Sequence, residues 1–182
     1  AAQALDISMA KELTPLKMDR AVFKTDLSRI EAGPQGWDMV QFLVSTNPGT
    51  PAGPLAKIAS GGELSRFLLA LKFCLRNAED TRTVIFDEID RGVSGATADA
   101  VGRRLSRLAQ DAQVLVVTHS PQVAALGDRH FQVVKQQSND MTLSRVDLLS
   151  DTARVDEIAR MISGDKITTE ARAAARTLIE GR

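Results

Sequence analysis

Two short runs of consecutive apolar residues constrain the fold of this chain more than any other feature. Residues 83–86 (TVIF) and 114–117 (VLVV) are rich in β-branched side chains and lack polar alternation. Strands of a parallel sheet have this pattern because both of their faces are covered. Between the runs, a helical stripe is formed by Ala98, Val101, Leu105 and Leu108. A strand–helix–strand unit of this kind joins parallel strands by a right-handed crossover. The runs therefore predict an α/β protein with a mainly parallel sheet layered with helices.

The rest of the chain alternates between strand and helix patterns. A GPQG turn at residues 33–36 predicts a hairpin, and three prolines between residues 48 and 54 predict a loop. The other predicted elements are a helix that ends near Pro15, hairpin strands over 22–27 and 37–44, a helix from residue 60 with a core stripe of Leu64, Phe67, Leu68, Leu71 and Leu75, a helix with Ser120 as its cap and Pro121 first, strands over 131–135 and 141–146, and two final helices.

Composition excludes several classes of protein. The 182 residues are 43% hydrophobic and 25% charged, as in globular domains and unlike disordered chains. Lysine and arginine number 23 and aspartate and glutamate 23, so any contact with DNA must come from a local patch. No apolar run reaches the ~20 residues of a membrane span, and no membrane partner is expected. The single cysteine, Cys74, is expected to be a core thiol in a reducing compartment.

Two carboxylates, Asp87 and Glu88, directly follow the first apolar run, and His119 follows the second. Open α/β sheets bind ligands at the carboxyl ends of their strands. Taken singly, however, each signal is weak. An acidic pair of this kind is more often a solvated strand end, and a lone histidine there is more often an edge residue with satisfied hydrogen bonds.

The SGGE sequence at residues 60–63 has two interpretations. Ser60 and Glu63 have the spacing of a helix capping box. Alternatively, the Ser-Gly-Gly turn presents backbone N–H groups and the positive end of a helix dipole to phosphate oxygens. Its occurrence together with the strand-end carboxylates and a histidine favours nucleotide hydrolysis, in which an aspartate holds Mg²⁺, a glutamate activates water and a histidine contacts the phosphoryl group.

In this order, the motifs resemble those of ABC-type ATPase heads. Residues 60–63 resemble the signature motif, 84–88 Walker B, 89–90 the D-loop and 116–119 the switch-histidine segment. The longer strings KIASGGELSRFLLALKF, FDEIDRGVSG and THSPQVAALGDRHFQVVKQ resemble the RecN DNA-repair family, an SMC-like group, and the resemblance runs along the whole chain. Arg91 and Ser120 depart from the usual family strings, where a small polar residue and leucine are more common.

The resemblance also implies a missing part. A P-loop has the pattern G-x-x-x-x-G-K-[ST], and this sequence contains no such string. In SMC-like proteins, the P-loop lies in an N-terminal lobe that a long antiparallel coiled coil joins to the C-terminal lobe. We therefore expect residues 1–14 to be the end of the returning coil and residues 15–182 to be the C-terminal lobe of an ATPase head. Such a chain is half an active site and is expected to be inactive alone.

By resemblance, the cofactors are ATP and Mg²⁺, and each candidate residue has an implied role. Asp87 is the metal ligand, Glu88 the general base and His119 the contact to the γ-phosphate. Two heads clamp the nucleotides between them, and Asp90 couples the two sites. The residues that hold the nucleotide of the opposite head are Ser60, Gly61 and Gly62.

The implied partners are the N-terminal P-loop lobe of the same protein, a second head in an ATP-sandwiched homodimer, and DNA through the complete protein. The implied location is the cytoplasm, at the nucleoid. Two rival functions are a nonhydrolytic tether, which has no need of Glu88, and a transporter subunit, which the N-terminal coil pattern disfavours. Arg103, Arg104 and Arg107 are predicted on the polar side of their helix, where a solvated face is a more common explanation than a DNA site.

Overall fold

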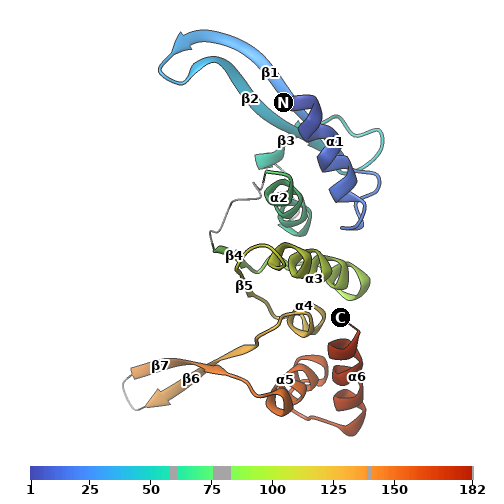
Figure 1. Ribbon diagram of the computed structural model, residues 1–182, viewed down its shortest axis with the longest axis vertical. Helices are drawn as coiled ribbons and strands as arrows, with labels where there is room; N and C mark the ends of the chain where they lie inside the picture. The colour runs from blue at the N-terminus through green and yellow to red at the C-terminus, as the bar shows by residue number, and fades with distance from the viewer. Residues whose placement is uncertain (58–60, 76–82, 139–140, 182) are drawn as a thin grey trace. The chain divides into compact units, whose positions relative to one another are not determined.

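The computed structural model describes residues 1–57, 61–75, 83–138 and 141–181. It confirms the α/β class, with helices and three sheets along the chain (Figure 1). The chain divides into two compact units, Ala1–Val117 and Thr118–Arg182. The boundary predicted after residue 14 stays a prediction. In the described part of the chain, no helix combines the length and apolar character needed to cross a membrane.

The first unit holds the parallel strands that the apolar runs predicted. Strands β4 (Val84–Asp87) and β5 (Val114–Val117) pair in parallel, with Val84 opposite Val114 and Asp87 opposite Val117. The other elements of this unit are α1 (Ala2–Leu13), β1 (Val22–Gly33), β2 (Gly36–Ser45), β3 (Gly53–Pro54), the 3-10 turn η1 (Leu55–Lys57), α2 (Gly61–Cys74) and α3 (Gly95–Ala109).

Parallel pairing is confined to β4 and β5 among the described strands. Strands β1, β2 and β3 form an antiparallel sheet, and so do β6 (Phe131–Ser138) and β7 (Met141–Leu148) of the second unit. The physical reason is connection length, because a short turn can join antiparallel strands only. Among the residues that the structure describes, the predicted parallel sheet is therefore represented by one pair of strands.

The core of the first unit forms where α1 packs against α2. Met9, Leu13 and Phe67 are fully or almost fully buried there. The stripe predicted for α2 is wrong at Leu68 and Leu75, which are 43% and 59% exposed, because the described residues leave that side of the helix uncovered. The stripe predicted for α3 is confirmed, and its buried members are Ala98, Val101, Leu105 and Leu108.

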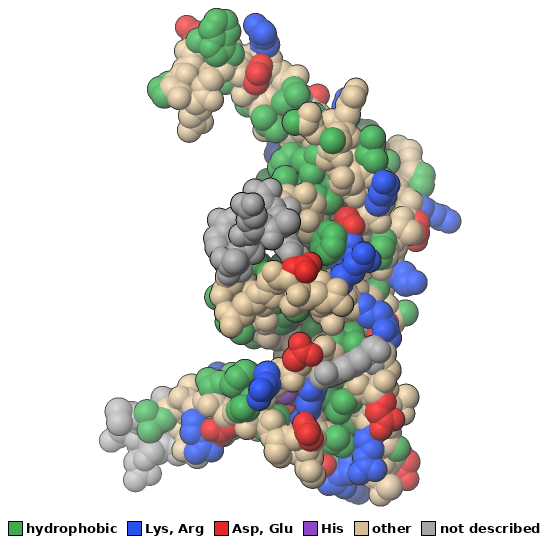
Figure 2. Space-filling model, in the orientation of Figure 1, with side chains coloured by type: hydrophobic (Ala, Val, Ile, Leu, Met, Phe, Trp, Pro, Cys, Tyr) green, Lys and Arg blue, Asp and Glu red, His purple; other side chains and the backbone are tan. Residues whose placement is uncertain are grey.

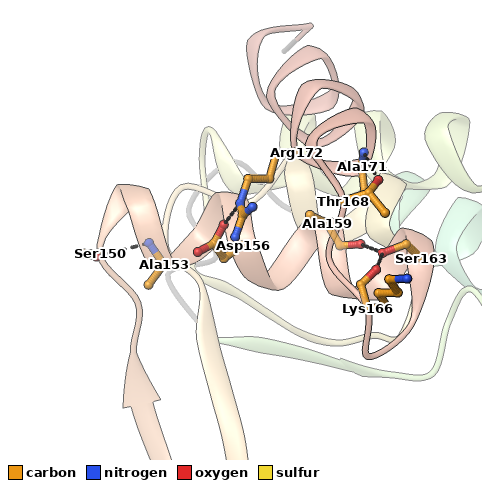
Figure 3. Close-up of polar contacts among 9 residues, drawn as sticks. All are labelled: Ser150, Ala153, Asp156, Ala159, Ser163, Lys166, Thr168, Ala171 and Arg172. Carbon is orange, nitrogen blue, oxygen red and sulfur yellow. Dashed lines mark hydrogen bonds and ion pairs between the residues drawn. The ribbon is translucent and has the colours of Figure 1, made fainter.

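The second unit is built on two helices joined by a short connection, α5 (Asp151–Ser163) and α6 (Thr169–Glu180), together with the short helix α4 (Pro121–Ala125). Ser150 and Thr168 cap the two longer helices by accepting from the N–H groups of Ala153 and Ala171 at 3.3 and 3.2 Å (Figure 3). Caps of this kind stabilise a helix by about 1 kcal/mol. The helices pack around a small core of Ala125, Ile158, Ala159, Ala171 and Ala175.

A polar contact also joins these two helices on their outer side. The Nε of Arg172 on α6 donates to Oδ1 of Asp156 on α5 at 2.6 Å (Figure 3). At the end of α5, the Ser163 hydroxyl lies 3.0 Å from the carbonyl oxygens of both Ala159 and Lys166. These contacts fix the connection between α5 and α6.

Candidate active site

The two predicted catalytic carboxylates lie at the carboxyl end of β4. Asp87 is the last residue of the strand, and both Asp87 and Glu88 are exposed. Glu88 has a φ of +49°, in the left-handed region that residues other than glycine seldom occupy. Its N–H donates to the carbonyl of Val117 at 3.0 Å, which ties this turn to the end of β5. The carboxylates are therefore held on a constrained turn and are accessible to a ligand.

The turn that follows brings Arg91 back to Glu88. The Arg91 N–H donates to the Glu88 carbonyl at 2.9 Å, and the Arg91 guanidinium lies 3.5 Å from a Glu88 carboxylate oxygen. Both side chains are largely exposed, so this ion pair adds at most about 1 kcal/mol to stability. Asp90 is completely buried. Its predicted coupling role stays a prediction, and any contact with a second head would involve the surface of the turn rather than this carboxylate.

The start of α2 packs directly against this turn. A Cβ added at Gly62 would lie 2.9 Å from the Arg91 carbonyl oxygen and 3.3 Å from Cγ1 of Val93. At Gly61, by contrast, an added Cβ would meet no described atom within 4 Å. The structure thus brings Gly62 to the segment that follows Asp87 and Glu88. Ser60 lies outside the described residues, so its two interpretations stay open.

We expect Gly62→Ala to lower the free energy of unfolding by about 1–3 kcal/mol, because the new methyl group forces the helix away from the backbone of the turn. Gly61→Ala is the matched control, and we expect a change of less than about 1 kcal/mol there. Urea denaturation measures both variants. Equal unfolding midpoints for the two would contradict the close packing at Gly62.

Arg66 connects the glycine end of α2 to the chain that follows α1. Its Nε donates to the Gly62 carbonyl at 3.2 Å, and one terminal nitrogen donates to the Leu16 carbonyl at 3.1 Å. Burial lowers the pKa of Arg66, and the nearby Glu63 partly opposes the shift. No motif in the sequence pointed to this residue. Its spacing of four residues from Gly62, which puts both on one side of the helix, is the signal that could have identified it.

His119 is exposed near the start of the second unit. The backbone beside it is held locally, because the Ser120 N–H donates to Oγ1 of Thr118 at 2.9 Å. The predicted helix start is confirmed, with Ser120 at the N-cap position and Pro121 first, but the Ser120 side chain makes no capping hydrogen bond. Its hydroxyl donates instead to Oε1 of Gln122 at 2.9 Å. The grouping of His119 with the carboxylates stays a prediction.

Asp87 and Glu88 are the residues of this chain that could bind Mg²⁺. No group of three metal-ligating side chains occurs in the part of the chain that the structure describes. Mg²⁺ characteristically binds one or two carboxylates and takes its other oxygens from water and substrate phosphates. Two adjacent, exposed carboxylates at a strand end are compatible with that mode.

Arg104 corrects one prediction made from the sequence. It does not lie on the polar side of α3 but is 93% buried, whereas Arg103 and Arg107 are exposed. Its guanidinium forms an ion pair with Glu12 of α1 and lies 3.8 Å from the centre of the Phe73 ring of α2. The reason is helical geometry, because position 104 falls three residues after Val101 and shares the buried stripe.

Solved structures show which class of protein has this fold. The Smc head domain of Pyrococcus yayanosii superposes with a TM-score of 0.68 at 19% identity, over 88% of this chain and 29% of that one. A chain from a study of ATP-driven dimerization and DNA-stimulated activation of SMC ATPases gives 0.62 at 17% identity, over 90% of this chain and 94% of that one. The fold is that of an SMC-type ATPase head.

Sequence relatives identify the family. The DNA repair protein RecN of Rickettsia conorii is 46% identical over 178 residues, that of Vibrio cholerae 43% over 180, and that of Bacillus subtilis 39% over 195. The chain belongs to the RecN family. Each alignment includes 98% of this chain, which spans about a third of the length of these relatives. The chain matches no protein-family model.

Proposed function

We propose that this chain is the C-terminal half of an SMC-like ATPase head that binds ATP between two heads and hydrolyses it during repair of DNA double-strand breaks. One observation carries the proposal. Gly62 at the start of α2 packs on the turn that follows Asp87 and Glu88, so the segments that resemble a signature motif and Walker B are neighbours in the first unit. The RecN relatives, which are DNA repair proteins, support the proposed process.

ATP is the substrate in this proposal. Mg²⁺, when bound, supplies positive charge that stabilises the transferring phosphoryl group. Asp87 provides an oxygen ligand for it. Glu88 accepts a proton from the attacking water, and its exposed position at the strand end leaves it accessible to that water. His119 contacts the γ-phosphate.

The start of α2 serves a different nucleotide, the one held by the opposite head. N–H groups at a helix N-terminus bind phosphate oxygens, and the helix dipole favours the negative charge. No described atom would lie within 4 Å of a Cβ added at Gly61, so the described residues leave room for that ligand. Ser60 adds its hydroxyl, and the turn that contains Asp90 couples the two sites. The assembly is therefore a homodimer with ATP in its interface.

An exposed apolar face on the β4–β5 strand pair supports the proposal that another lobe packs against this chain. Ile85, Leu115 and Val117 of the β4–β5 pair are 66%, 46% and 55% exposed, although parallel strands normally have both faces covered. Among the described residues, this face of the strand pair therefore stays exposed. We infer that the N-terminal P-loop lobe of the same protein covers this face, and that the complete protein acts on DNA at the nucleoid, in the cytoplasm.

Calorimetric titration with MgATP tests the proposal that this chain carries only half of an ATP site. We expect no measurable binding to the chain alone, because it has no P-loop to hold the phosphates, and binding with steady-state hydrolysis by the complete protein. Micromolar binding of MgATP to the chain alone would contradict the proposal that the chain carries only half of the site. Binding without hydrolysis by the complete protein would favour the nonhydrolytic tether.

A further inference from the structure

A pocket of about 380 Å³ lies in the first unit between the turn after α1 and one side of α3. Its lining is strongly basic. Lys17 comes from the turn after α1, and Arg103, Arg104 and Arg107 come from α3, with Asp99 as an acidic lining residue. In Figure 2, Lys and Arg side chains lie over and beside the part of the molecule that Figure 1 labels α3. We call this site the α3 basic pocket.

Part of this charge is neutralised within the chain. Asp99 accepts from Nε of Arg103 at 2.9 Å, and Glu12 forms an ion pair with the buried Arg104. The side chains of Lys17 and Arg107 make no hydrogen bond or ion pair with any described residue, and both are exposed. Burial lowers the pKa of Arg104, and the positive charge of Arg107 lowers it further. The pocket therefore presents a net positive charge with two cations available to a ligand.

The lining also indicates the chemistry of that ligand. The other described residues of the pocket are Pro15, Ala96 and Ala100. None of these is aromatic, so the pocket offers no platform on which a nucleobase could stack. Trp and Tyr, which together with Arg dominate protein–protein contacts, are absent from the same described lining, so arginine is the only residue of this kind present. The lining therefore favours a ligand that is recognised by its negative charge, such as a chain of phosphates. Lys and Arg are the residues that make phosphate contacts.

We propose that the α3 basic pocket binds the phosphodiester backbone of DNA without reading its sequence. The inference rests on the proposed function, which supplies DNA as the polyanion. It also accounts for how a chain with a formal charge of zero contacts DNA, because the field that matters is local. Arg103 and Arg107 are four residues apart and so project from neighbouring turns on one side of α3, which suits a ligand with repeated charges.

The test is fluorescence anisotropy of a labelled random-sequence duplex with the complete protein across a range of salt concentrations. The double variant Lys17→Gln/Arg107→Gln is expected to raise the dissociation constant about tenfold. The slope of log affinity against log salt should fall by about two, since each phosphate contact contributes about 0.9. Arg176→Gln is the matched control, because Arg176 is an exposed arginine on α6 outside the pocket.

Each outcome has a distinct meaning. Wild-type protein that binds no DNA would contradict the proposed function itself. Wild-type protein that binds DNA, with the same affinity and salt slope in the double variant, would overturn the pocket assignment alone. Arg107→Lys keeps the positive charge and should therefore keep the wild-type salt slope. This variant separates loss of charge from a folding defect as the cause of any effect in the glutamine variants. A competition experiment tests whether the site prefers an acidic protein. If polyglutamate displaces DNA as effectively as an oligonucleotide of equal charge does, the proposal is overturned.

Discussion

Glu88→Gln in the complete protein is expected to slow ATP hydrolysis by about 10²–10⁴-fold, the usual effect of losing a general base. The amide keeps the shape of the side chain but cannot take a proton from water. Asp87 and the start of α2 are unchanged, so ATP should still bind and the heads should still pair. The variant is therefore expected to accumulate as an ATP-bound dimer.

Steady-state hydrolysis and sedimentation with ATP measure the two halves of this prediction. Glu31→Gln is the matched control, because Glu31 is an exposed glutamate on β1, away from the strand-end turn. Asp87→Asn should weaken head pairing as well as hydrolysis, since it removes the metal ligand. Wild-type turnover by Glu88→Gln would falsify its role as the base. Loss of ATP binding by the same variant would mean that Glu88, rather than Asp87, holds the metal.

The second large effect is on stability and concerns the Glu12–Arg104 pair. The side chains are 14% and 8% exposed, so each charge depends on the other for compensation. Glu12→Leu is expected to lower the free energy of unfolding by about 3–5 kcal/mol, because it leaves a buried guanidinium without its counter-charge. The ring of Phe73, 3.8 Å away, compensates only part of this loss.

A double-mutant cycle checks this expectation by urea denaturation. Glu12→Leu combined with Arg104→Leu should be close to the wild type in stability, because apolar pairs often replace buried ion pairs without loss. Asp99→Asn is the control, since its partner Arg103 is exposed on the same helix, and it should cost no more than about 1 kcal/mol. If Glu12→Leu costs as little as this control, the pair is not the link between α1 and α3.

Local patterns in the sequence determined the elements and the position of the carboxylates. Two β-branched runs with a helical stripe between them predicted the parallel pair β4–β5, and the strand end then placed Asp87 and Glu88 at its carboxyl edge. The start of α4 was predicted from Ser120 and the following Pro121 alone. Such features depend on residues close together along the chain, so periodicity and turn chemistry are sufficient to predict them.

Only the tertiary structure decided which distant groups meet. The sequence does not show that Gly62 packs on the Arg91 carbonyl, or that Glu12, Phe73 and Arg104 meet. It also does not show that Ile85 and Leu115 stay exposed. Apolar periodicity identifies a side of an element that is suited to burial. Whether that side is covered, and by which residues, depends on contacts between segments far apart in the chain.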